Sequence, residues 1–194
     1  YLIDCGDCPK DLPKTATKIG GELSYSYILK ATEFALNNKI DALVTGPISK
    51  ESLRHANLVF TGHTTMLKHL TKTNNVSMAF HSPKLNVVLA SIHISIQDVP
   101  TYLTKSVVID AISSAHKLMS LLGKNNPQIA VAGLNPHASE NGLFGHEEKL
   151  IIEPAILHFR QKGADVVGPL SADTIFLRAS EGEFDVVVAM YHDQ

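Results

Sequence analysis

Short apolar runs recur along the chain and alternate with longer stretches in which apolar residues follow a helical period. Runs such as Ile129–Ala132 and Val186–Met190 are too short for buried helices and carry no polar alternation. They therefore predict strands that are buried on both faces. Between them, Leu23–Leu36 and Lys105–Leu122 show helical spacing. Strands that alternate with helices predict an α/β fold, a three-layer sandwich with a mixed, largely parallel sheet.

Other segments follow the same alternation. Further strands are predicted at 1–4, 42–44, 76–80, 86–92 and 164–167. Further helices are predicted from the cap Ser49 to His55, around Met66–Leu70 and over Glu147–Lys162. Because Pro154 lies inside the last of these, that helix is either kinked there or restarted with proline in its first turn. Gly168-Pro169 predicts a break and Ser171–Thr174 a polar turn.

Composition excludes several classes of protein. The 194 residues are 44% hydrophobic and 19% charged, which is ordinary for a globular domain or two small lobes. A net charge of −2 without a basic stripe argues against a nucleic-acid partner. No apolar run approaches the roughly 20 residues of a membrane span. We therefore expect a cytoplasmic protein that binds neither nucleic acid nor membrane.

The two cysteines, Cys5 and Cys8, form a single CxxC. Two thiols do not complete a tetrahedral zinc site, and no second pair follows. A redox CxxC would open a helix, whereas Pro9 and Pro13 indicate a loop here. We interpret the pair as structural, in a chain without a disulfide framework that fits a reducing compartment.

Three of the ten histidines share one setting. His93, His137 and His192 each come at or just past the end of a predicted strand. If those strands are parallel neighbours, the three imidazoles converge on one edge of the sheet, where open α/β sheets bind ligands. Three imidazoles suit Zn²⁺, Co²⁺ or a similar ion. The alternative is that each ring only hydrogen-bonds a nearby loop.

Polar residues near helix starts and strand ends offer further candidates. Gly62-His63-Thr64 precedes a predicted helix, so it can bind an anion through free backbone N–H groups or simply provide an N-cap. Asp173 and Asp193 are the acids best placed to orient ligands or relay protons. Both could equally be turn or cap residues.

Six motifs, in order and at the expected spacing, resemble the 4-hydroxythreonine-4-phosphate dehydrogenase family. They are LVTGPISK (43–50), GHT (62–64), IH (92–93), GLNPH (133–137), GPLSAD (168–173) and MYHDQ (190–194). The resemblance implies a fold similar to that of isocitrate and isopropylmalate dehydrogenases. It also implies a homodimeric, NAD-dependent oxidoreductase of pyridoxal phosphate biosynthesis, assisted by a divalent metal (Zn, Co or Mg).

The resemblance also implies roles for individual residues. The family's metal-binding histidines, shared across the dimer, match His93, His137 and His192. Its contacts to the phosphorylated substrate match His63 and Thr64. Family acids near the metal match Asp173 and Asp193, which are expected to be catalytic in a supporting or proton-handling role. The implied reaction oxidises the C3 hydroxyl of 4-phosphohydroxy-L-threonine to a β-keto acid, which decarboxylates to 3-amino-2-oxopropyl phosphate.

The resemblance also indicates which part of a family member residues 1–194 correspond to. Residues 1–194 resemble the central part of a single two-lobed α/β dehydrogenase, without the family's N-terminal and C-terminal segments and the glycine-rich cofactor loop. We therefore expect this piece to be inactive alone and assign no NAD-binding residue. The alternatives are a paralogous dehydrogenase of a four-carbon aldonate 4-phosphate, a metal-dependent hydrolase or lyase, and a non-catalytic interaction fragment. The absence of an HExxH motif counts against the hydrolase.

Overall fold

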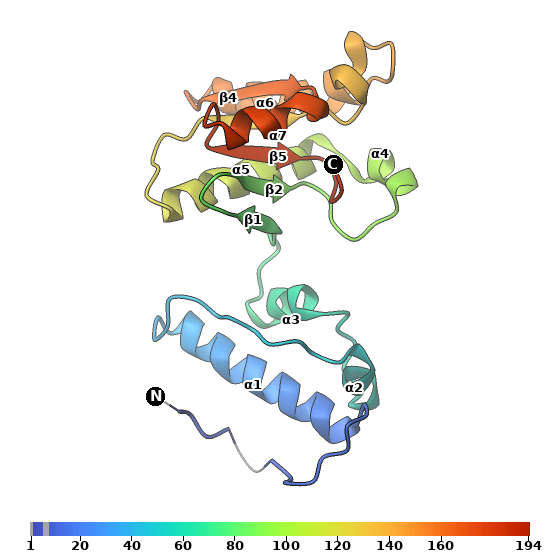
Figure 1. The fold of residues 1–194 in the computed structure, drawn as a ribbon, viewed down its shortest axis with the longest axis vertical. Helices are drawn as coiled ribbons and strands as arrows, with labels where there is room; N and C mark the ends of the chain where they lie inside the picture. The colour runs from blue at the N-terminus through green and yellow to red at the C-terminus, as the bar shows by residue number, and fades with distance from the viewer. Residues whose placement is uncertain (1, 6–7) are drawn as a thin grey trace. The chain divides into compact units, whose positions relative to one another are not determined.

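The computed structural model describes residues 2–5 and 8–194, which divide into two compact units at Val76/Ser77 (Figure 1). Unit 1 is helical, and unit 2 contains the sheet. Within the described residues, no helix is both long enough and apolar enough to cross a membrane.

The described part of unit 1 contains three helices: α1 (Lys18–Leu36), α2 (Lys50–His55) and α3 (His63–Leu70). Thr17 caps α1 by accepting a hydrogen bond from the backbone N–H of Gly20, and Ser49 caps α2 in the same way. The side chains of Ile28, Leu53 and Met66, one from each helix, form a small buried cluster. The predicted cap at Ser49 and the helix that follows it are therefore confirmed.

Two of the predicted strands in unit 1 are wrong. Residues 2–4 and 42–44 are not in strands, and Val44 is 94% exposed. Tyr1, the first residue of the former run, lies outside the described residues. A strand needs a neighbour to pair its N–H and C=O groups, and the described part of unit 1 contains no strand to supply one.

Unit 2 is built on a five-stranded sheet in the order β1-β2-β5-β3-β4. The strands are β1 (Ala79–His81), β2 (Asn86–Leu89), β3 (Ile129–Ala132), β4 (Val166–Leu170) and β5 (Val186–Ala189). β1 pairs antiparallel with β2, and all other neighbours are parallel. The sheet is therefore mixed and largely parallel, as predicted.

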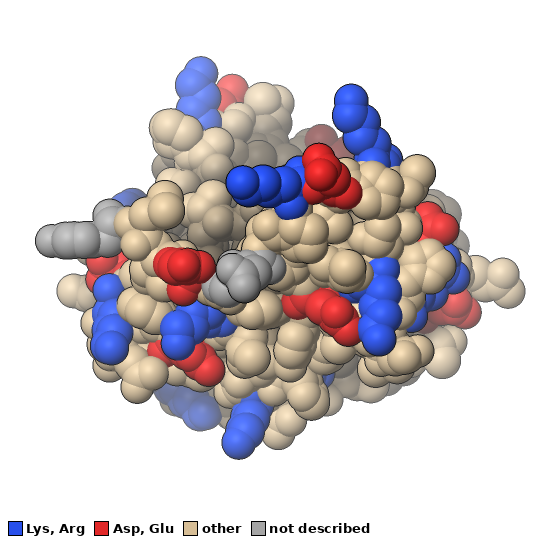
Figure 2. Space-filling view, turned by 90° about the horizontal axis from the view of Figure 1, so that it is seen from below, with Lys and Arg blue, Asp and Glu red and all other residues tan. Residues whose placement is uncertain are grey.

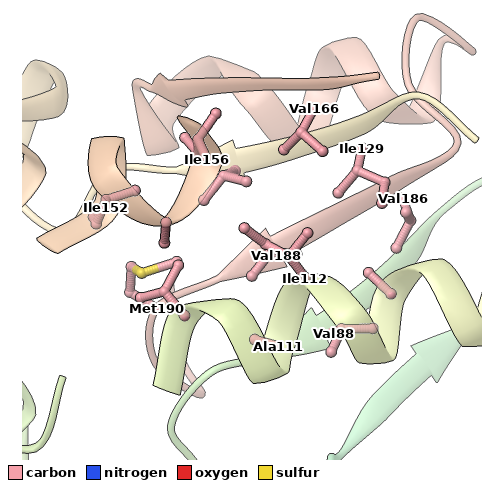
Figure 3. Packing of buried hydrophobic residues seen from close by; sticks show 14 of the residues in the cluster. Val88, Ala111, Ile112, Ile129, Ile152, Ile156, Val166, Val186, Val188 and Met190 are labelled. Atoms are coloured by element: carbon pink, nitrogen blue, oxygen red, sulfur yellow. The ribbon is translucent and has the colours of Figure 1, made fainter. Parts of the chain in front are cut away.

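Helices cover both faces of this sheet. Side chains alternate along β3, so Ile129 and Val131 pack with α5 (Lys105–Leu121) and α6 (Glu153–Arg160), while Ala130 and Ala132 pack with α7 (Ala172–Ser180). Figure 3 shows Ile112 of α5 beside Val188 of β5, and Val88 of β2 belongs to the same buried cluster. The arrangement is the predicted three-layer α/β sandwich.

Short helical segments connect these elements. A 3-10 turn, η1 (Ile96–Asp98), leads into α4 (Val99–Tyr102), and η2 (Pro136–Glu140) follows β3. A π-helical segment, η3 (Glu148–Ile152), precedes α6. Pro154 lies in the first turn of α6, which continues directly from η3, because both Ile152 and Glu153 have helical backbone angles. The proline therefore follows a change from π-helical to α-helical geometry and not a break between two helices.

Two predictions near β4 are corrected by the structure. Gly168-Pro169 does not end the strand but lies within β4, joined by a cis peptide bond, and the break that it produces is a shift in the register with β3. Ser171–Thr174 is not a polar turn, because Ser171 is the N-cap of α7 and the next three residues form its first turn. Polar residues with turn propensity are also those favoured at helix starts, so the two structures share a sequence pattern.

Charge is mixed on the face shown in Figure 2. Among the coloured residues, Lys and Arg are interspersed with Asp and Glu. An anionic ligand that approached this face would be recognised by local contacts, because no broad positive surface is present on the coloured part of it.

The core of unit 2 predicts a large response to truncation. Ile112 is fully buried between α5 and the sheet, so Ile112→Ala should lower the free energy of unfolding by about 2–5 kcal/mol. Leu121 lies at the end of the same helix and is 78% exposed, so Leu121→Ala should change the free energy of unfolding by no more than about 0.5 kcal/mol. Urea unfolding followed by circular dichroism compares the two. Equal losses would contradict the packing described here.

Candidate functional site

The three strand-end histidines follow three adjacent parallel strands. β5 lies between β2 and β3, and the three strands run in the same direction. His93, His192 and His137 come after β2, β5 and β3 respectively, so all three are at the carboxyl-terminal edge of the sheet. This edge is where parallel α/β sheets form ligand sites.

His93 and His192 lie close together. Their ring centroids are 5.9 Å apart, and both residues are exposed. Ladder bonds continue past the two strands, because the N–H groups of Ala90 and Ser91 donate to the carbonyls of Ala189 and Met190. The Ser91 hydroxyl donates to the Met190 carbonyl as well, at 2.7 Å. These bonds keep the two outgoing segments in register up to the histidines.

His137 is at the same edge but faces a different partner. Its Nδ1 is 3.8 Å from Oδ2 of Asp173, in the first turn of α7, and its side chain is 64% exposed. It therefore does not point into the core. Within the described residues, no three His, Cys, Asp or Glu side chains are grouped so that they could hold a metal ion. One chain therefore brings together two of the three imidazoles predicted to bind the metal, those of His93 and His192.

The acids predicted to support the site lie beside the histidines. Oδ1 of Asp193 is 3.2 Å from Nδ1 of His192. A proton on that Nδ1 would leave the Nε2 lone pair free to bind a ligand. Asp173 lies farther from its histidine, with 3.8 Å between its Oδ2 and Nδ1 of His137. This contact is an ion pair only when the imidazole is protonated.

The loop that carries His137 has an unusual backbone. Residues 137–141 have φ values of 52°, 50°, 67°, 45° and 58°, and none of the five is glycine. Each left-handed residue costs roughly 1–2 kcal/mol in an L-amino-acid chain. Such a turn persists only where its surroundings hold it in place.

Contacts on both sides hold the segment that precedes this turn. Buried Glu148 accepts hydrogen bonds from the backbone N–H groups of Leu134 and Asn135 at 2.8 and 2.7 Å. The Gln194 amide donates to the Gly133 carbonyl and accepts from the backbone N–H of Met190. Gln194 thereby links the end of β3 to the end of β5.

The sequence pattern does not reveal the role of these supporting residues. The helix predicted over Glu147–Lys162 places Glu147 and Glu148 at a helix start, and Gln194 belongs to the MYHDQ motif. Two adjacent acids directly after a glycine-rich loop were the available signal, but the pattern does not say which backbone groups the acids bind.

The predicted substrate contacts lie in unit 1. The N-cap of α3 is Gly62, which has no side chain that could accept a hydrogen bond from the first turn. Neither Thr64 nor Thr65 caps the helix, so its first backbone N–H groups have no side-chain cap. Nε2 of His63 is buried and has no hydrogen-bond partner among the described residues. A cavity of about 320 Å³ has His63, Thr45 and Gly46 in its wall. The LVTGPISK and GHT motifs therefore share one hollow.

Fold and site together define an α/β sandwich protein with histidines at the carboxyl edge of its parallel strands. The family model of the pyridoxal phosphate biosynthetic protein PdxA matches residues 2–194. The chain belongs to the PdxA family, which confirms the resemblance found in its motifs.

Named relatives fall into two groups. The D-threonate 4-phosphate dehydrogenase of Cupriavidus necator is 44% identical over 99% of this chain and 58% of its own length. The 4-hydroxythreonine-4-phosphate dehydrogenase of Geobacter metallireducens is 43% identical over 92% of this chain and 52% of its own length. The chain thus spans about half the length of the curated relatives it matches.

A solved structure supports the fold independently. The crystal structure of a 4-hydroxythreonine-4-phosphate dehydrogenase from Burkholderia phymatum matches with a TM-score of 0.91 at 44% identity. The match covers 98% of this chain and 58% of that one.

The carboxyl of Glu147 predicts a pH effect. Its hydrogen bond from the Asn135 side chain, together with backbone N–H donors, lowers the pKa of this carboxyl below its ordinary value. Because the fold favours the ionised form, the stabilisation is complete above the ordinary carboxyl pKa and is lost as the pH falls through the lowered one. The stability difference between wild type and Glu147→Gln should therefore be largest at neutral pH and shrink below about pH 4. Thermal unfolding across pH measures it, and a constant difference would contradict this assignment.

Proposed function

We propose that this chain forms the central part of an NAD-dependent, divalent-metal-assisted dehydrogenase of 4-phosphohydroxy-L-threonine. The observation that carries the proposal is the pair His93 and His192 at one sheet edge, in a member of the PdxA family. His137 follows the neighbouring strand β3 at the same edge. The enzyme would act in the cytoplasm as a homodimer with its site at the interface.

The imidazoles of His93 and His192 would provide two ligands for a divalent ion. Because the third histidine faces Asp173 in a single chain, we propose that the ligand set is completed across the dimer. When bound, Zn²⁺, Co²⁺ or Mg²⁺ would lower the pKa of the substrate hydroxyl and stabilise the negative charge that develops on its oxygen.

The proposed reaction is a two-electron oxidation of the substrate's C3 hydroxyl. NAD would accept the hydride released from C3, and the C3 hydroxyl proton would go to a base. The resulting β-keto acid loses carbon dioxide, and protonation of the remaining carbon gives 3-amino-2-oxopropyl phosphate. Asp173 and Asp193 would orient the imidazoles they contact and take part in moving the proton.

The substrate phosphate would bind at the start of α3. The first backbone N–H groups of that helix carry no side-chain cap, and the helix dipole favours an anion there. His63 and Thr64 are the first two residues of the helix, and the unpartnered Nε2 of His63 is a candidate donor to a phosphate oxygen.

A second substrate is supported by the relatives. The Cupriavidus necator protein is named for D-threonate 4-phosphate and is as similar to this chain as those named for 4-hydroxythreonine 4-phosphate. The two compounds share a carboxylate, a C3 hydroxyl and a 4-phosphate, and they differ at C2, which bears an amine in one and a hydroxyl in the other. The metal and phosphate contacts proposed here would serve both.

One assay separates the two substrates. The full-length protein is incubated with a divalent ion and NAD, first with 4-phosphohydroxy-L-threonine and then with D-threonate 4-phosphate, and NADH absorbance is followed. Turnover of the first supports the proposal. Turnover of the second alone assigns the protein to the aldonate 4-phosphate group, and turnover of neither refutes the dehydrogenase function.

Removing either paired histidine should abolish most of the activity. Because metal-assisted charge stabilisation supplies several kcal/mol to the transition state, His93→Ala or His192→Ala should lower kcat/KM roughly 100-fold or more. His158 on α6 contacts Lys162 and Phe159, so His158→Ala is the matched control and should retain activity. A His192 variant with full activity would exclude the proposed ligand pair.

A further inference from the structure

Glu148 is a buried carboxylate without a cationic partner. It is 1% exposed, and none of the ion pairs between described residues includes it. Burying an ionisable group is costly unless hydrogen bonds compensate for the lost water. The position of its donors therefore indicates what the residue does.

All three donors belong to the two residues that follow Gly133. One oxygen, Oε1, accepts from the successive backbone N–H groups of Leu134 and Asn135, and Oε2 accepts from the Asn135 side chain at 2.9 Å. The same Asn135 amide also donates to Glu147 at 2.8 Å. The two carboxylates thus hold the backbone and the side chain of one residue, which lies two positions before His137.

The chain makes room for these bonds at two glycines. A Cβ on Gly133 would lie 2.8 Å from the Cα of Ala138 and 3.1 Å from Oε1 of Glu148. A Cβ on Gly145 would lie 2.5 Å from Nδ2 of Asn135 and 2.6 Å from Oε2 of Glu147. A side chain at position 133 would push Ala138 and Glu148 away from the end of β3, and one at position 145 would separate Asn135 from Glu147.

We propose that Glu148, reinforced by Glu147 through Asn135, is a positioning residue that holds the left-handed turn at 137–141 and thereby fixes His137 at the carboxyl edge of the sheet. The carboxylate does not itself reach the substrate. It acts through backbone N–H groups that regular secondary structure does not satisfy. This inference rests on the proposed function only for its catalytic consequence, because the contacts themselves belong to the folded chain.

Graded variants at position 148 test the proposal in the full-length protein. Glu148→Ala removes all three hydrogen bonds. Glu148→Gln keeps an oxygen that can accept from both backbone N–H groups, and so should recover part of the function. Glu153, exposed in the first turn of α6, supplies the matched control Glu153→Gln.

The first readout is independent of activity. In metal-free protein, hydrogen exchange of the Leu134 and Asn135 amides should become about tenfold faster or more in Glu148→Ala, to a smaller degree in Glu148→Gln, and should not change in Glu153→Gln. Amides of α5 should keep their protection. Unchanged exchange at Leu134 and Asn135, or an equal increase throughout unit 2, would overturn the proposal.

The second readout concerns the edge of the sheet. Titration with Co²⁺ alone should show affinity about 10–100-fold weaker in Glu148→Ala, and kcat should fall by a similar factor while KM changes by less than about threefold. Partial recovery in Glu148→Gln is expected. Wild-type Co²⁺ affinity and kcat in Glu148→Ala would refute a positioning role.

The two hypotheses can fail separately. If wild-type protein oxidises neither substrate, the proposed function fails, while local exchange and Co²⁺ binding still decide the role of Glu148. If the wild type is active and Glu148→Ala matches it in every readout, the proposed function stands and the positioning role is refuted.

Discussion

The parallel pairing of β5 with β2 on one side and β3 on the other is the constraint on which the rest of unit 2 depends. Val186–Ala189 is buried along its whole length, so this strand has no solvent-facing side chain and must be covered on both faces. Helices α5 and α6 cover one face and α7 covers the other. Because the three strands point the same way, their outgoing loops, each with a histidine, emerge at one edge.

Much of unit 2 could be predicted because its signals are local. The helix predicted over Lys105–Leu122 agrees with α5 (Lys105–Leu121) to within one residue, since helical periodicity is a property of neighbouring positions. The strand-end placement of His93, His137 and His192 was also correct. The strand predicted at 42–44 failed because a strand depends on a partner, and an apolar run does not reveal whether one exists.

The site was harder to predict than the fold for the same reason. Sequence spacing placed three histidines at one edge, but it did not show that His192 would lie beside His93 while His137 faces Asp173. Nor did it show that five non-glycine residues would adopt a left-handed turn, or that Glu148 would bind the segment before it. These outcomes depend on contacts between residues far apart along the chain, which no local pattern encodes.

The order of the strands also has a consequence for how unit 2 folds. The central strand, β5, comes last among the five in the chain, and it pairs Val87 with Val187 across about 100 intervening residues. Contacts of such long sequence separation slow folding, because chain entropy is lost before the contacts form. During synthesis, the β1-β2 hairpin and the β3-β4 pair emerge before the strand that joins them. The edge that carries His93 and His192 therefore forms only after β5 has joined these two pairs.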